Sequence, residues 1–100
     1  MSLFPSPAFE IYNLLTPDGD GNNDTWYIEG IEDYPDNTAI IFNRWGDKVR
    51  EFTGYENLKN YWDGTNSKGE RLPAGTYYYI LNLNSTDSRT GWILLRTNTE

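Results

Sequence analysis

Thr76-Tyr77-Tyr78-Tyr79-Ile80-Leu81-Asn82-Leu83 is the longest run of strand-forming residues in this chain of 100 residues. Tyrosine, isoleucine and threonine favour the pleated, half-buried surface of a β-sheet. Almost every side chain of the run is apolar or aromatic, so we expect one face to fill the core and the other to pack under a loop or bind a partner. The surplus face is one of two alternate sets: Thr76, Tyr78 and Ile80, or Tyr77, Tyr79 and Leu81.

Shorter strand-like segments lie before and after this run. They are Phe9 to Tyr12, Trp26 to Glu29, Thr38 to Arg44, Lys48 to Phe52 and Thr90 to Arg96. Turn-forming residues separate them, and no segment has a convincing helical period. Six or seven short strands with turns between them are typical of an all-β, antiparallel β-sandwich, with a small barrel as the alternative.

Oxygen-bearing side chains recur in the loop between the first two predicted strands. Asp18, Asp20, Asn22 and Asp24 occupy alternate positions, with glycines between the first three. This spacing is that of a calcium loop, with Glu29 as the closing ligand, although the flanks are too short or too strand-like for the helices of an EF-hand. Two interpretations follow: a site for calcium or another oxygen-binding cation, or an Asx- and glycine-rich turn that needs no ion.

Acidic residues are concentrated in the first part of the chain. The net charge is −7, and all eight acids before Arg44 lie in a segment without Lys or Arg, so residues 1–43 carry −8 and residues 44–100 carry +1. Such a field repels nucleic acid and anionic lipid and attracts a divalent cation. A solvated, solubilising face is the other interpretation.

The chain has no cysteine and no histidine. Disulfide frameworks, zinc-thiolate sites and nucleophiles activated by histidine are therefore excluded. A pair of carboxylates could in principle hydrolyse a glycoside. Because the acids cluster on predicted turns and a domain this small rarely offers a deep cleft, we expect no enzymatic activity.

Neither a membrane span nor a signal peptide is expected. No run approaches the ~20 apolar residues of a transmembrane helix, and Met1-Ser2-Leu3-Phe4-Pro5 lacks a basic n-region and an apolar h-region. We expect residues 1–7 to be a linker or an artificial start, residues 8–97 to form one domain and residues 98–100 to be a tail.

Several stretches occur together in the order typical of one family. They are Leu15-Thr16-Pro17-Asp18-Gly19-Asp20-Gly21-Asn22-Asn23-Asp24-Thr25-Trp26, Ile28-Glu29-Gly30-Ile31, Tyr34-Pro35, Ile41-Phe42-Asn43-Arg44-Trp45-Gly46, Tyr61-Trp62-Asp63-Gly64-Thr65, Leu72-Pro73-Ala74-Gly75-Thr76-Tyr77-Tyr78-Tyr79, and Gly91-Trp92 with the basic Arg96. On them the chain resembles the gliding motility-associated C-terminal domain, the type B sorting domain of proteins exported by the type IX secretion system. Trp62 to Tyr79 is also similar to the immunoglobulin-like domain of flagellar hook-capping proteins.

The resemblance implies an immunoglobulin-like antiparallel β-sandwich of six to seven strands. One position departs from the family pattern: the family usually has Asn where this chain has Asp18, which adds a charge to the loop. Family members also tend to end within a few residues of the final basic strand, which Thr97 to Glu100 follow here.

The function implied is that of a non-catalytic sorting domain. It would direct a larger upstream protein through the periplasm and the type IX secretion system to the cell surface or exterior. Its partners would be the outer-membrane secretion and attachment machinery and the upstream domains, with no nucleic acid. The candidate contact surfaces are the exposed edge of the last strand and the surplus face of the Tyr-rich strand.

A calcium-stapled carbohydrate-binding β-sandwich module is the alternative function. Trp26, Trp45, Trp62 and Trp92 could stack on sugar rings, although packing in the core or anchoring of loops is the interpretation we favour for each. Sugar binding requires at least two aromatic rings exposed on one surface, whereas the sorting function requires none.

Overall fold

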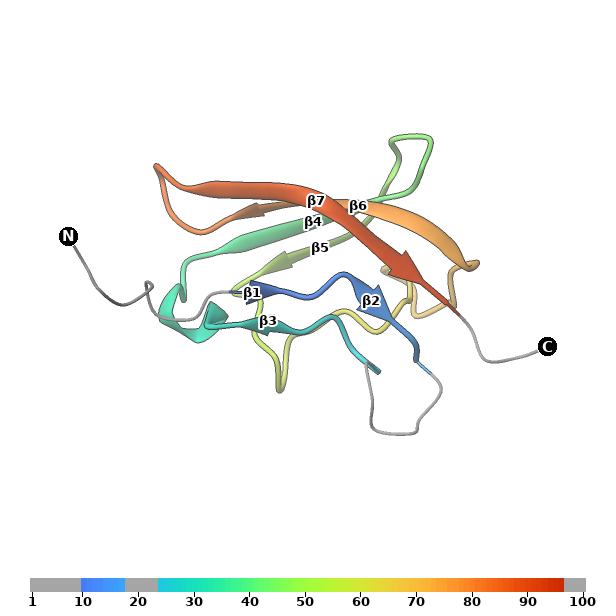
Figure 1. The fold of residues 1–100 in the computed structure, drawn as a ribbon, viewed down its shortest axis with the longest axis horizontal. Helices are drawn as coiled ribbons and strands as arrows, with labels where there is room; N and C mark the ends of the chain where they lie inside the picture. Colours follow the sequence, from blue (N-terminus) through green and yellow to red (C-terminus); the bar gives the residue numbers. More distant parts are fainter. Residues whose placement is uncertain (1–9, 18–23, 97–100) are drawn as a thin grey trace.

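The computed structural model of the protein describes residues 10–17 and 24–96. Apart from one turn of 3-10 helix, all regular elements in these ranges are strands, and the strands form two open sheets that lie one above the other (Figure 1). The elements are β1 (Glu10–Ile11), β2 (Leu14–Leu15), β3 (Ile28–Glu29), η1 (Ile31–Asp33), β4 (Thr38–Phe42), β5 (Lys48–Thr53), β6 (Gly75–Asn82) and β7 (Ser88–Leu95). The predicted two-layer, all-β architecture is confirmed, and the open sheets do not form a barrel.

The larger sheet has the strand order β2-β7-β6-β4-β5. The Tyr-rich run is β6, which pairs antiparallel with β4 on one side and with all of β7 on the other. The prediction of wholly antiparallel pairing is wrong at one place, because β2 pairs parallel with β7. The chain crosses from the smaller sheet to the larger one between Ile11 and Leu14, and it enters beside β7 in the direction in which β7 runs.

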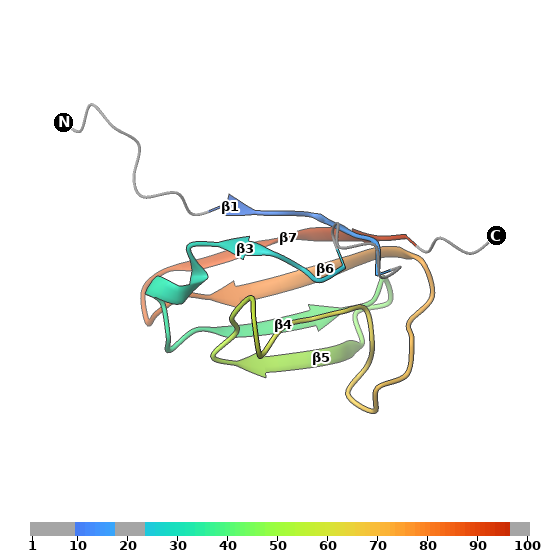
Figure 2. The same cartoon turned by 90° about the horizontal axis from the view of Figure 1, so that it is seen from below.

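The smaller sheet contains only β1 and β3, each of two residues. The predicted strand Trp26 to Glu29 is shorter than expected because the backbone N–H of Trp26 donates to the carbonyl of Trp62 at 2.8 Å, outside the β1–β3 ladder. The irregular segment between β5 and β6 completes this layer, as Figure 2 shows in the view from the side of the smaller sheet.

Asparagine side chains fix the irregular layer. Asn57 accepts from the backbone N–H of Ile28 at 2.9 Å and donates to the carbonyl of Ile28 at 2.7 Å, so its amide pairs with β3 as a neighbouring strand would. The fully buried Asn37 donates to the carbonyls of Tyr34 and Tyr55 and accepts from the backbone N–H of Tyr55 at 2.8 Å. Each polar group placed against the core is thereby hydrogen-bonded, as burial requires.

The core lies between the two layers and is rich in aromatic residues. On β6, Tyr77, Tyr79 and Leu81 point into it, and the fully buried Trp26 and Trp62 reach it from the irregular layer. The other buried apolar residues are Leu15, Ile28, Ile31, Ala39, Ile41, Phe52, Tyr55, Leu83, Ile93 and Leu95. The surplus face of β6 is therefore the set Thr76, Tyr78 and Ile80.

A close approach between β6 and β7 explains the glycine in the last strand. A Cβ at Gly91 would lie 2.6 Å from the Tyr79 hydroxyl and 2.9 Å from two of its ring carbons. Gly91 is the register partner of Tyr79, so the missing side chain lets the ring lie flat across β7. The ring also packs against Trp26, with centroids 5.0 Å apart.

Candidate recognition surface

The outer face of the larger sheet carries a row of aromatic side chains. Phe42, Tyr78 and Trp92 are direct register partners across β4, β6 and β7. Tyr78 is 46% exposed and Trp92 is 48% exposed, and neither is covered by any part of the described chain. We call these three residues the aromatic row.

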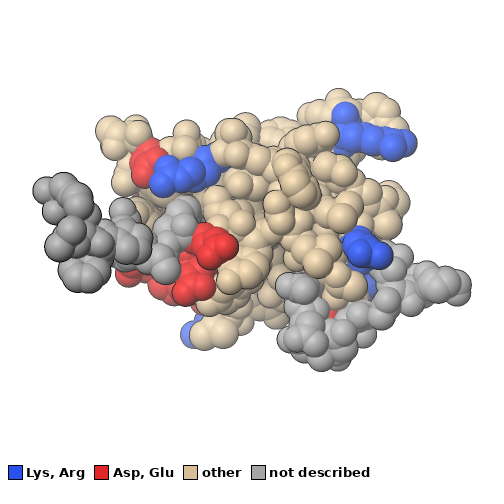
Figure 3. All heavy atoms as spheres, in the orientation of Figure 1, with Lys and Arg blue, Asp and Glu red and all other residues tan. Residues whose placement is uncertain are grey.

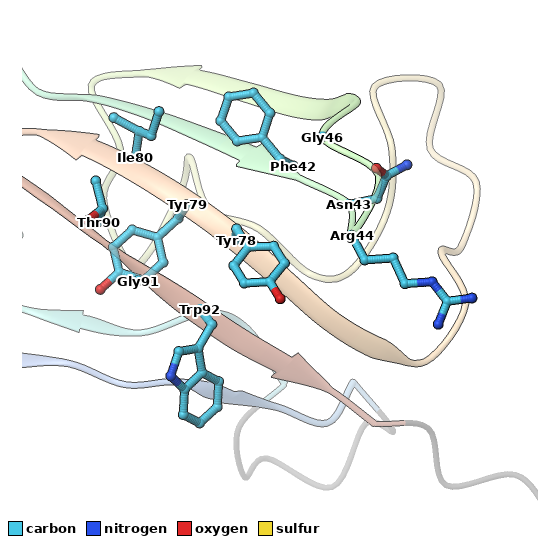
Figure 4. A pocket seen from close by; sticks show the side chains of 10 residues that line it. All are labelled: Phe42, Asn43, Arg44, Gly46, Tyr78, Tyr79, Ile80, Thr90, Gly91 and Trp92. Carbon is cyan, nitrogen blue, oxygen red and sulfur yellow. The ribbon is translucent and has the colours of Figure 1, made fainter.

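An open hollow of about 580 Å³ lies on this face, around the aromatic row (Figure 4). Ile80 and Thr90 lie at one end of it and Arg44 at the other. Arg44 is the only charged residue among those that line the hollow within the described ranges. The hollow is therefore an apolar surface with one cation at its end, which is suited to binding a partner.

A rigid hairpin tip extends from this face between β4 and β5. The side-chain oxygen of Asn43 accepts from the backbone N–H groups of Trp45 and Asp47, each at 2.9 Å, and Gly46 takes a left-handed φ of 86° that favours glycine. The guanidinium of Arg44 lies 4.4 Å from the ring centroid of Trp45, which is 71% exposed. Trp and Arg are the residue types that most often dominate binding at protein interfaces.

The last strand, β7, has a neighbouring strand from the described chain on its outer side along only part of its length. β2 lies beside it only at Leu94 and Leu95, where the N–H of Leu94 donates to the carbonyl of Asn13 at 2.8 Å. Of the strands in the described ranges, none pairs with β7 on this side between Ser88 and Ile93. Within the described residues, the first part of β7 is therefore the predicted edge, and β2 covers the last part.

Acidic side chains gather at the end of the molecule formed by β1, β3 and η1 (Figure 3). Glu10 and Glu29 are register partners in the smaller sheet, and η1 carries Glu32 and Asp33. The negative charge of Glu10, followed by burial and the charge of Glu29, raises the pKa of the Tyr12 phenol above its usual value. The aromatic row is remote from this acidic end.

The predicted calcium ligands are only partly within the described residues. Asp18, Asp20 and Asn22 lie outside them, whereas Asp24 and Glu29 are described. Glu29 is on β3 opposite Glu10. In the ranges 10–17 and 24–96 no three acidic side chains come together in a way that could hold a metal ion.

The four tryptophans divide into two pairs. Trp26 and Trp62 are fully buried, as expected for core packing, whereas Trp45 and Trp92 are exposed on or beside the outer face. Phe42 and the Arg44–Trp45 pair also belong to this surface, although they were not among the residues predicted for it. Strand alternation, which places Phe42 on the face opposite the buried Ile41, was the available signal.

A family model described as CHU_C Type IX secretion signal domain matches residues 9–95. The chain belongs to this family. The match confirms the resemblance drawn from the sequence and spans both sheets and the outer face. No curated protein matches the chain at a significant level.

The CHU_C family is one of sorting signals and is not a catalytic family. A sorting domain implies attachment to an upstream protein, contact with a secretion machinery, and export to the cell surface or exterior. The described part of the chain has no helix with the length and apolarity needed to cross a membrane.

Proposed function

We propose that this domain is a non-catalytic address that carries an upstream protein through the periplasm and the type IX secretion system to the cell surface. The family match over residues 9–95 carries the proposal. It is supported by the outer face, where aromatic residues and one cation are exposed and available to a partner. The partners are the outer-membrane secretion and attachment machinery.

The fold type that we propose for the domain is immunoglobulin-like. In such folds a G-F-C sheet, extended by C′ in the variable type, packs on a sheet that begins with strands A and B. The order β7-β6-β4-β5 corresponds to G-F-C-C′, and β1-β3 corresponds to A-B. The irregular segment between β5 and β6 takes the place of the remaining strands of the second sheet.

A fusion experiment tests the proposed function. A periplasmic reporter followed by residues 1–100 is expressed in a bacterium with a type IX secretion system, and surface reporter is measured on intact cells. We expect surface reporter in the wild-type strain and none in a strain without the system or with the domain removed. A reporter that stays in the periplasm of the wild-type strain would contradict the proposal.

We further propose that the acidic loop binds calcium through Asp18, Asp20, Asn22, Asp24 and Glu29. The alternation of oxygen ligands supports this, as does the way the ends of the loop are held. The carbonyl of Pro17 accepts from Arg71 at 3.3 Å, and the Trp26 indole donates to the carbonyl of Tyr12 at 2.7 Å. Because the rest of the domain fixes the ends of the loop, the entropic cost of ordering the loop around an ion is smaller.

Calcium should therefore stabilise the domain by mass action. At a free calcium concentration ten times the dissociation constant, the gain is ~1.4 kcal/mol, which corresponds to a rise in melting temperature of roughly 5–10 °C. We expect this rise at millimolar calcium in the wild type and in the control Asp36→Ala, and we expect it to be lost in Asp20→Ala. Identical melting curves of the wild type with calcium and with chelator would refute the site.

A calcium-stapled carbohydrate-binding module is the second candidate function. The observation that favours it is the exposure of two aromatic rings, Tyr78 and Trp92, side by side on one sheet face. Rings in this arrangement can stack on the apolar faces of sugars.

Titration calorimetry with soluble glycans separates the two functions. If the outer face binds sugar, heat of binding is expected in the wild type and is lost in Trp92→Ala, while Trp45→Ala, at the hairpin tip, retains it. No heat with any glycan would remove this candidate and leave the sorting function unaffected.

A further inference from the structure

The first part of β7, which pairs on one side with no strand of residues 10–17 and 24–96, has backbone groups directed away from the sheet. Because Leu94 donates its N–H to Asn13, its backbone groups point away from β6. Residues two apart in a strand point the same way, so the N–H and C=O groups of Trp92, Thr90 and Ser88 also point to the open side. These five residues of edge, Ser88 to Trp92, extend over about 17 Å.

Two other edges of the described fold, those of β3 and β5, are protected. The amide of Asn57 occupies the edge of β3 at Ile28. On β5, Asn60 donates to the carbonyl of Thr53 at 3.0 Å, the ion pair Lys48–Glu51 lies on the strand, and the pairing with β4 shifts register between Ile41 and Phe42. Charges, bulges and side-chain caps are the usual means by which proteins prevent a strand from adding to an edge.

The edge of β7 carries a charge at its start, where Arg89 forms an ion pair with Asp87, but its centre from Thr90 to Trp92 has neither a charge nor a bulge. Thr90, Gly91 and Trp92 are uncharged, and they continue β7 without a shift in its register with β6. Tyr79 supports Gly91 from the core side, so the edge is held in the extended geometry of a strand. Trp92 and Thr90 direct their side chains to the outer face, where they line the hollow.

We propose that an extended segment of a protein of the export machinery adds as a strand to β7 along Ser88–Trp92. The segment hydrogen-bonds to the outward backbone groups and places alternate side chains against Trp92 and the adjoining hollow. This inference rests on the proposed sorting function and identifies the part of the domain that is recognised. Strand addition is a common mode of peptide recognition, in which backbone bonds give affinity and side-chain pockets give specificity.

The chemistry of the edge selects a polypeptide as the occupant. The outward N–H and C=O groups repeat at the spacing of an extended backbone, which a glycan does not reproduce. A second copy of the domain is disfavoured because each chain carries a net charge of −7 and two copies repel each other.

Substitutions at Thr90 test the proposal in the reporter fusion. Thr90→Pro removes an outward N–H that β6 does not use, and proline is tolerated at such an edge position. Thr90→Lys leaves the N–H in place and puts on the edge the charge that natural edges use to block pairing. Thr90→Ala is the matched control. Melting curves of the purified variants establish that each is folded.

We expect Thr90→Pro and Thr90→Lys to reduce surface reporter about tenfold or more, because both block strand addition, and Thr90→Ala to be exported as the wild type is. If Thr90→Pro does not fold, the export of Thr90→Lys alone tests the proposal.

Wild-type export by either folded variant overturns the proposal. Loss of export that occurs only in Trp92→Ala also overturns it, because that result assigns recognition to the outer face instead. A purified domain that sediments as a dimer, and as a monomer after Thr90→Lys, would show that a second copy occupies the edge, against the proposal. Failure of the unsubstituted fusion to reach the surface would instead refute the sorting function itself.

Discussion

The hydroxyl of Tyr55 joins the separate parts of the irregular layer. It donates to the carbonyl of Trp26 and accepts from the backbone N–H of Trp62 at 2.9 Å. The Tyr55 ring packs edge-to-face on Trp26 and Phe52, with centroids 5.2 and 5.0 Å apart. The smaller sheet has only two short strands, so this one buried side chain performs much of the cross-linking that a ladder of backbone hydrogen bonds performs in a larger sheet.

The exposed surface follows from this uneven construction. Once the irregular layer covers one face of the larger sheet, no further described segment remains to cover the other. The aromatic row is therefore exposed, and β2 is too short to close the edge of β7. For a domain that other proteins recognise, a suitable surface is an apolar face beside a strand whose outer edge is not paired with another described strand.

The larger sheet could be predicted from sequence because its strands alternate in a simple way. The Tyr-rich run and Lys48 to Phe52 became strands. Of the predicted strand Thr38 to Arg44, the part Thr38–Phe42 did, whereas Asn43 and Arg44 lie in the hairpin connection. The irregular layer could not be predicted, since it is held by side chains such as Asn57 and Tyr55 that act across 29 residues of chain. The parallel partner of β7 is two residues long, too short to have a pattern of its own. The recognition surface could also be predicted only in part. The alternation of side chains defined the two faces of β6, but which face is buried depends on the packing of the other layer.

The measurement that tests this account most directly is the unfolding free energy of Tyr55→Phe as a function of pH. Removing the hydroxyl leaves two buried backbone groups without a partner, so a loss of about 2–4 kcal/mol is expected at pH 7 while the fold is kept. Burial raises the pKa of Tyr55, so the stability from this group is fully present below pH ~10, its unfolded value, and falls as the pH rises further. The wild type should therefore lose up to ~1.4 kcal/mol per pH unit more than Tyr55→Phe above that value. Equal stability of the two proteins at pH 7, with the same slope at alkaline pH, would show that the hydroxyl does not hold the second layer together.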